Sequence, residues 1–275
     1  MYPDALAVIN LPAPPRIAVA PVAPCRLYGD GAVERGILVC ADCARRYRIR
    51  DGIADLLGTP PIFASPAQFT NTLPPTAWSY ERIWRSRALT ILSGEPFGYE
   101  RELPLLTGLA EPARGGLILD IACSNGLYAR ALAEVPGTHQ RTVIGIDHAM
   151  PMLRQARAYA RAAGLQISYI CAQAQALPFG SQSAATLVMG GSLNEIGDAD
   201  RALHEMRRVG APDVRHVQMA LVQATTPAGR RLQAGLGFGG IAFPTLVELN
   251  RRFAVAGWRL RAQWRYRVVV FSLLT

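Results

Sequence analysis

Lysine is absent from this 275-residue sequence, so each of its 29 basic residues is an arginine. Chemistry that needs a lysine amine, such as Schiff-base formation, is therefore excluded. The arginines are scattered along the chain rather than gathered in runs, so the net charge of +9 favours a nucleic-acid partner only weakly. No apolar stretch approaches the roughly 20 residues that a membrane-spanning helix needs. We therefore expect no transmembrane segment.

Cysteine is also scarce, with five residues, and an odd number of them is typical of a protein in a reducing compartment. The first residues, MYPDALAVINLPAPP, lack the basic and apolar segments of a secretory signal. We therefore expect a cytoplasmic location. Hydrophobic residues make up 50% of the chain and charged residues 18%, which is enough for a large core and excludes a disordered protein. The oligomeric state is left open.

The composition divides the chain into four parts. Residues 1–24 are rich in Pro and Ala and are expected to form an extended arm, and residues 25–58 a small compact module. Residues 59–111 combine a Pro-rich linker with lid helices. Residues 112–275 are expected to form the main domain, because strand-like and helix-like segments alternate from Gly115 onward.

This alternation predicts the fold class. Strands are expected at 117–121, 142–147, 167–171, 184–189, 214–222 and, as a pair, within 259–274. Helices are expected at 127–135, 151–163, 199–209 and 246–256. Such a pattern builds βαβ units. We predict an α/β, Rossmann-like fold: a mostly parallel seven-stranded sheet with an antiparallel C-terminal hairpin, plus a small N-terminal ribbon-like module.

The turn after the first predicted strand has the composition of a nucleotide site. Asp120 lies at the end of the strand, and residues 122–126 (Ala-Cys-Ser-Asn-Gly) are small enough to let a ligand approach the backbone. The second strand ends at Asp147, whose carboxylate can accept hydrogen bonds from both hydroxyls of a ribose. The alternative is that the small residues only pack a tight turn and that each aspartate caps a helix.

Four segments in order, residues 119–132, 143–153, 176–179 and 202–209, carry a family resemblance. Residues 112–275 resemble the class I methyltransferases of the ubiquinone and menaquinone biosynthesis type. The resemblance implies that the cofactor is S-adenosylmethionine, with the turn at its methionine moiety, Asp147 on its ribose and Gly190 near its methyl group. The residues it places around the cofactor are Asp120, Ala122, Cys123, Ser124, Gly126, Asp147, His148, Met152, Gln173, Ala174 and Gly190.

Three of these positions depart from the family pattern. Members usually have Gly where this chain has Ala122 and Ser124, and Asp where it has Gln173. Ser124 adds bulk beside the expected cofactor tail. Gln173 can still accept a hydrogen bond from an adenine amino group through its carbonyl oxygen, but it has no charge. A non-catalytic relative that binds S-adenosylmethionine therefore stays open as an alternative.

Residues 25–57 resemble the zinc-ribbon-like segment that precedes some methyltransferases, including a group that acts on rRNA guanine. The resemblance lies in Cys40-Ala41-Asp42-Cys43 and the residues that follow. A structural zinc site needs four ligands, but Cys25 is followed three residues later by Tyr28 rather than by a second Cys. We expect a degenerate ribbon without zinc. A site with Cys25, Cys40 and Cys43 as three thiolate ligands is the alternative.

The acceptor site is expected to combine lid aromatics with a Gly-rich stretch at 224–245. The lid contributes Tyr80 and Trp84, and the Gly-rich stretch Phe238 and Phe243. These apolar side chains favour a small, apolar acceptor of the quinone, pigment or polyketide type. The alternative, supported by the charge and the ribbon, is an RNA base methyltransferase.

Methyl transfer depends mainly on alignment, and a base is needed only if the acceptor loses a proton. Glu195 is the candidate base, and Asn194 is the candidate to orient an acceptor oxygen.

Overall fold

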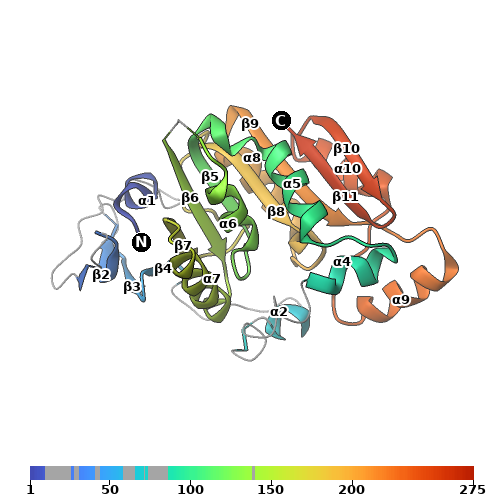
Figure 1. Ribbon diagram of the computed structural model, residues 1–275, viewed down its shortest axis with the longest axis horizontal. Helices are drawn as coiled ribbons and strands as arrows, with labels where there is room; N and C mark the ends of the chain where they lie inside the picture. Colours follow the sequence, from blue (N-terminus) through green and yellow to red (C-terminus); the bar gives the residue numbers. More distant parts are fainter. Residues whose placement is uncertain are drawn as a thin grey trace.

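The computed structural model describes residues 1–9, 26–27, 31–40, 44–57, 66–70, 72–73, 86–137 and 140–275. These residues form one mixed sheet with helices on both faces (Figure 1). The strand order is β1-β2-β3-β4-β7-β6-β5-β8-β9-β11-β10.

The seven predicted strands are all present. They are β5 (Gly116–Ile121), β6 (Arg141–Asp147), β7 (Ile167–Cys171), β8 (Ala184–Gly190), β9 (Gly210–Leu221), β10 (Leu260–Tyr266) and β11 (Val269–Leu274). The neighbours β7-β6-β5-β8-β9 are parallel, whereas β11 is antiparallel to both β9 and β10. The predicted α/β fold with a C-terminal hairpin is thus confirmed. Its inner strands are almost wholly buried, as expected for parallel strands covered on both faces.

The predicted strand count of seven was too low. Within the described residues the sheet holds 11 strands, or ten without the two-residue β1. The additional strands are β1 (Arg26–Leu27), β2 (Val33–Val39), β3 (Arg46–Arg50) and β4 (Ile53–Asp55). β4 pairs in parallel with β7, so these N-terminal strands continue the main sheet. The sequence did not predict this pairing because a strand pattern does not show which sheet edge accepts another strand.

Alternating residues of each inner strand contribute to two hydrophobic cores. In β5, Leu119 and Ile121 face one core and Ile118 the other. The first core is covered by α1 (Pro3–Val8), α8 (Ala199–Val209) and α10 (Leu246–Val255). The second is covered by α5 (Tyr99–Ala110), α6 (Leu127–Glu134) and α7 (Met150–Ala162).

Three further helices lie along one edge of the molecule. They are α2 (Pro66–Thr70), α4 (Ser86–Ser93) and α9 (Pro227–Gly237). Figure 1 shows them along the lower edge, toward which β6 and β8 run. Among the described residues, no helix has the length and hydropathy required to cross a bilayer.

Two segments have more helix than the sequence predicted. Within the expected extended arm, Pro3–Val8 forms α1, because Ala5 and Leu6 are buried in the first core. Residues 10–24 lie outside the described part. The Gly-rich stretch at 224–245 contains α9, which begins where the Thr226 hydroxyl accepts a hydrogen bond from the Gly229 N–H at 3.1 Å.

Candidate active site

The turn between β5 and α6 is held by the strand's own acid. The Asp120 carboxylate is buried, and its Oδ2 accepts the Ala129 backbone N–H at 2.8 Å. Ala129 lies in the first turn of α6, where N–H groups have no partner inside the helix. Asp120 therefore fixes the angle at which the helix leaves the strand. This contact was foreseen only as the alternative, helix-capping role of the aspartate.

Three alternate residues of this turn have left-handed backbone conformations. Their φ values are 53° at Ala122, 51° at Ser124 and 75° at Gly126. Glycine takes this conformation freely, whereas a residue with a Cβ loses roughly 1–2 kcal/mol in it. The chain thus keeps a glycine-type backbone path at two positions where the family glycine is missing. At Gly126 a Cβ would lie 2.7 Å from the buried Tyr169 hydroxyl, so only glycine fits there.

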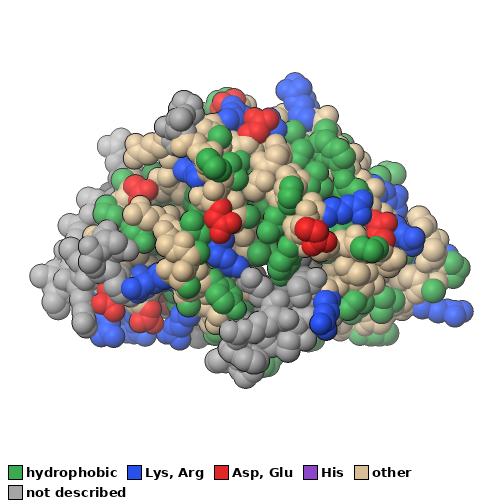
Figure 2. Space-filling model, viewed as in Figure 1, with side chains coloured by type: hydrophobic (Ala, Val, Ile, Leu, Met, Phe, Trp, Pro, Cys, Tyr) green, Lys and Arg blue, Asp and Glu red, His purple; other side chains and the backbone are tan. Residues whose placement is uncertain are grey.

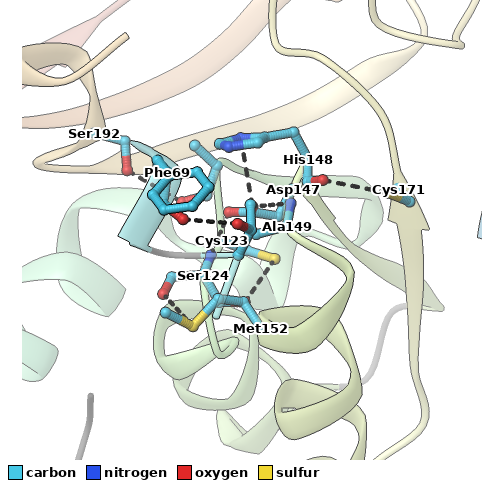
Figure 3. A network of polar contacts seen from close by, with 11 residues as sticks. Phe69, Cys123, Ser124, Asp147, His148, Ala149, Met152, Cys171 and Ser192 are labelled. Atoms are coloured by element: carbon cyan, nitrogen blue, oxygen red, sulfur yellow. Dashed lines mark hydrogen bonds and ion pairs between the residues drawn. The ribbon is translucent and has the colours of Figure 1, made fainter. Parts of the chain in front are cut away.

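Asp147 joins this turn to the end of β6. Its Oδ2 accepts the Ser124 backbone N–H and its Oδ1 the Ala149 backbone N–H, both at 2.8 Å. Figure 3 shows Asp147 between these two residues. Cys123 also donates its backbone N–H to Ile146 of β6 at 2.9 Å. The two predicted halves of the site, 122–126 and Asp147, are therefore in direct contact.

Two residues expected beside the adenine, His148 and Met152, lie next to Asp147 and Ser124. The Ser124 hydroxyl lies 3.6 Å from the Met152 sulfur, and His148 Nδ1 lies 3.7 Å from Asp147 Oδ1. The Cys171 thiol donates to the His148 carbonyl at 3.5 Å (Figure 3). Gln173 and Ala174, which follow β7 closely, are also expected at the adenine. Gln173 is exposed and Ala174 is buried.

The two cysteines of this region are poor nucleophiles. Burial raises the pKa of the Cys123 thiol well above its usual value, and the carboxylates of Asp120 and Asp147 raise it further. Burial also raises the pKa of Cys171. Both thiols are therefore protonated at neutral pH, which makes covalent catalysis through a thiolate unfavourable.

A buried acid and phenol lie beneath the end of β8. A Cβ on Gly190 would lie 2.6 Å from the Tyr128 ring, so the ring packs directly under this glycine. The Tyr128 hydroxyl donates to the Glu102 carboxylate of α5, which is fully buried. Beyond Gly190, the Ser192 hydroxyl donates to the Ala122 carbonyl at 3.2 Å. This bond ties β8 to the β5 turn.

The sequence reasoning assigned no role to Glu102, Ser192 or Phe69. Figure 3 places Phe69, from α2, among the residues of the turn. Only for Glu102 was there a signal, because it shares helical spacing with the buried Leu106 and Leu109 of α5.

Asn194, in the segment after β8, forms a clamp: its side chain is hydrogen-bonded to two distant parts of the backbone. Its side-chain N–H group donates to the Leu221 carbonyl at 2.7 Å and to the Ala242 carbonyl at 2.5 Å. Its Oδ1 accepts the Leu221 backbone N–H at 2.8 Å. These contacts hold together the two ends of the segment that contains α9. The half-buried Glu195 is the next residue.

A cavity of about 230 Å³ lies beside this clamp. It is lined by Leu193, Asn194, Ala220, Ala242, Phe243, Pro244, Glu248, Leu249 and Arg252. Phe243, one of the predicted acceptor residues, thus faces a cavity next to Asn194. Phe238, the other, is 90% exposed and lies beyond the end of α9.

Several predicted residues cannot be placed. Tyr80, Trp84, Cys25 and Cys43 lie outside the described residues. Cys40 is buried. Among the residues that the structure describes, no group of three or more His, Cys, Asp or Glu is arranged to hold a metal. The expectation of a zinc-free module therefore stays a prediction.

Comparison with known proteins identifies the domain. Residues 118–213 match the family model described as a methyltransferase domain. Residues 118–213 are therefore a methyltransferase domain, and the relatives and the fold support the class I, S-adenosylmethionine-dependent type. A demethylmenaquinone methyltransferase of Thermus thermophilus is 42% identical over 103 residues, covering 36% of this chain and 44% of the relative. A 2-phytyl-1,4-naphthoquinone methyltransferase of Trichormus variabilis is 29% identical over 136 residues, covering 49% and 51%.

Two further matches extend over more of this chain. An uncharacterized chloroplastic methyltransferase of Arabidopsis thaliana is 28% identical over 188 residues, covering 65% of this chain and 52% of the relative. The chain spans about half the length of the curated relatives it matches. An S-adenosylmethionine-dependent methyltransferase of Aquifex aeolicus has the same fold, with a TM-score of 0.54 at 17% identity over 74% of this chain and 99% of that one.

Proposed function

We propose that this domain transfers a methyl group from S-adenosylmethionine to a small, quinone-type acceptor. The observation that carries the cofactor half is the hydrogen bond between Ser124 and Asp147, which brings the turn after β5 into contact with the end of β6. The acceptor half is supported by the relatives, which are named for demethylmenaquinone and for a phytylnaphthoquinone.

The residues present fit the cofactor. Each Asp147 oxygen accepts one backbone N–H and keeps a second lone pair, so the carboxylate can also accept the two ribose hydroxyls. Ala122 and Ser124 are half-buried and have small side chains that leave room beside the backbone. His148 and Met152 would border the adenine. Gly190 would lie near the methyl group, which the bound cofactor supplies as an electrophile on its sulfonium.

The chain's own residues mainly provide alignment. The Ser192–Ala122 bond joins the segment after β8 to the turn after β5, and the Tyr128 ring packs under Gly190 at the end of β8. The side-chain amide of Asn194 is used in backbone contacts, so we assign it a positioning role for residues 221–242 rather than contact with the acceptor. Glu195 remains our candidate to take a proton from an acceptor that must lose one.

The proposal is tested by offering a panel of acceptors with S-adenosylmethionine. The panel contains a reduced demethylated naphthoquinone with a short side chain, a simple phenol and an rRNA transcript, and methylated products are detected by mass spectrometry. We expect methylation of the naphthoquinol, with a lower kcat and little change in KM in Glu195→Gln. Methylation of the transcript alone would contradict the assignment. So would the absence of any product from a chain that binds the cofactor.

A further inference from the structure

Large apolar side chains are exposed along one edge of the molecule. They form what we call the apolar rim: Phe69, Leu73, Ile91, Leu232 and Phe238. These residues lie on or next to α2, α4 and α9, the three helices along the lower edge in Figure 1. The same edge holds the carboxyl ends of β6 and β8, and Figure 3 shows Phe69 among the residues of the candidate active site. The apolar rim therefore borders the place where cofactor and acceptor are expected to meet.

Helix α9 carries the most exposed part of the apolar rim. Its only buried residue is Gln233, whose side chain accepts the Ala224 N–H at 2.8 Å and donates to the Val222 carbonyl at 2.9 Å. Leu232 is 47% exposed, and Phe238, which follows the helix, is 90% exposed. Moving such side chains from water into an apolar medium is favourable. Polar contacts made by Gln233, Arg230 and Thr226 thus anchor a helix that leaves Leu232 and the following Phe238 exposed among the described residues.

The charges around α9 have one sign. Arg230 and Arg231 are exposed and directly precede Leu232, and no Asp or Glu occurs between Val214 and Val247. At the lower right of Figure 2, basic and apolar side chains lie next to one another. Exposed apolar residues flanked by arginines are typical of segments that lie in the headgroup region of an anionic bilayer. A nucleic acid would use the arginines but would leave Leu232 and Phe238 in water.

We propose that the apolar rim docks on the surface of an anionic lipid bilayer, with Leu232 and Phe238 inserted among the lipids and Arg231 at the headgroups. This inference rests on the proposed function, because a quinone with a long hydrocarbon chain is dissolved in a membrane. Asn194 links the two sites: it binds the carbonyls on both sides of the α9 segment and lies four residues beyond Gly190. A docked α9 is thereby tied to the segment that directly follows Gly190.

Co-sedimentation of the full chain with vesicles tests the proposal without any turnover. We expect binding to phosphatidylcholine vesicles that contain phosphatidylglycerol, and weaker binding to phosphatidylcholine alone. The double variant Leu232→Ser/Phe238→Ser should lower the partition coefficient more than about tenfold. Arg231→Gln should lower it about fivefold on anionic vesicles only. The matched control is Val247→Ser/Val255→Ser, which changes two exposed apolar residues of α10 and should bind like the unmodified chain.

Two outcomes would overturn the docking proposal: an unmodified chain that stays in solution with both kinds of vesicle, or a Leu232/Phe238 variant that binds as well as the control. Binding to rRNA but not to vesicles would instead indicate a nucleic-acid surface. A chain that binds anionic vesicles but never methylates a naphthoquinol would refute the proposed acceptor and leave the docking surface standing. Methylation of the naphthoquinol without vesicle binding would do the reverse.

Discussion

Replacing Asp147 with asparagine should weaken both the turn and cofactor binding. Each carboxylate oxygen accepts one backbone N–H, from Ser124 and from Ala149. An asparagine directs its own N–H group at one of these donors, so one of the two bonds is lost. A hydrogen bond to a charged group is worth about 1.5–3 kcal/mol, which is the expected loss of unfolding free energy. The same change removes one acceptor for a ribose hydroxyl, so the affinity for S-adenosylhomocysteine should fall about 10- to 100-fold.

Urea unfolding without ligand gives the first quantity, and titration calorimetry with S-adenosylhomocysteine gives the second. The matched control is Asp198→Asn, because Asp198 caps α8 by accepting the Arg201 N–H at 3.0 Å and is exposed. That variant should lose about 1 kcal/mol or less and keep its affinity. An Asp147→Asn protein with unchanged affinity would refute the role given to this carboxylate.

Three further predictions concern the core. Burial lowers the pKa of His216 to about 3, so below about pH 6.5 the unfolded chain binds a proton that the folded chain does not. The free energy of unfolding should therefore fall by about 2 kcal/mol from pH 7.5 to pH 5. In urea titrations, His216→Leu should make the free energy of unfolding less dependent on pH over this range. The buried Tyr169 hydroxyl has no hydrogen-bond partner among the described residues, so Tyr169→Phe should raise the free energy of unfolding by about 1 kcal/mol in thermal denaturation. A less stable variant would contradict this, because it would mean that the hydroxyl does have a hydrogen-bond partner. Gly190→Ala should lower the free energy of unfolding by about 1–3 kcal/mol, because the new Cβ displaces the Tyr128 ring. The control is Gly108→Ala in α5, where an added Cβ would meet no neighbouring atom within 4 Å and should raise the free energy of unfolding by up to about 1 kcal/mol. Equal effects of the two changes on the melting temperature would contradict the packing at Gly190.

The main domain was predictable because its signals are local. Apolar runs and helix stops predicted β5 to β11, and the acids at the ends of two strands predicted a candidate site whose two halves are in contact. Parallel strands bring their carboxyl ends to one edge of the sheet, so Asp120 and Asp147 need no long-range information to be placed near each other.

The parts that sequence reasoning missed depend on distant contacts. The pairing of β4 with β7 joins residues more than 100 positions apart, and no periodicity encodes it. Asn194 binds backbone groups 27 and 48 residues away. Because the sequence does not show these contacts, its side-chain amide was predicted to contact the substrate. Helix α9 contains three glycines, which favoured a loop, but its Thr226 cap and the buried Gln233 hold a helix there.

The most direct test of the whole account is a crystal structure of the full chain with S-adenosylhomocysteine. We predict that both ribose hydroxyls lie within hydrogen-bond distance of the Asp147 carboxylate, with the adenine beside His148 and Met152 and the sulfur near Gly190. A nucleoside bound elsewhere, or a crevice at residues 122–126 that stays closed by its own side chains at saturating ligand, would contradict it.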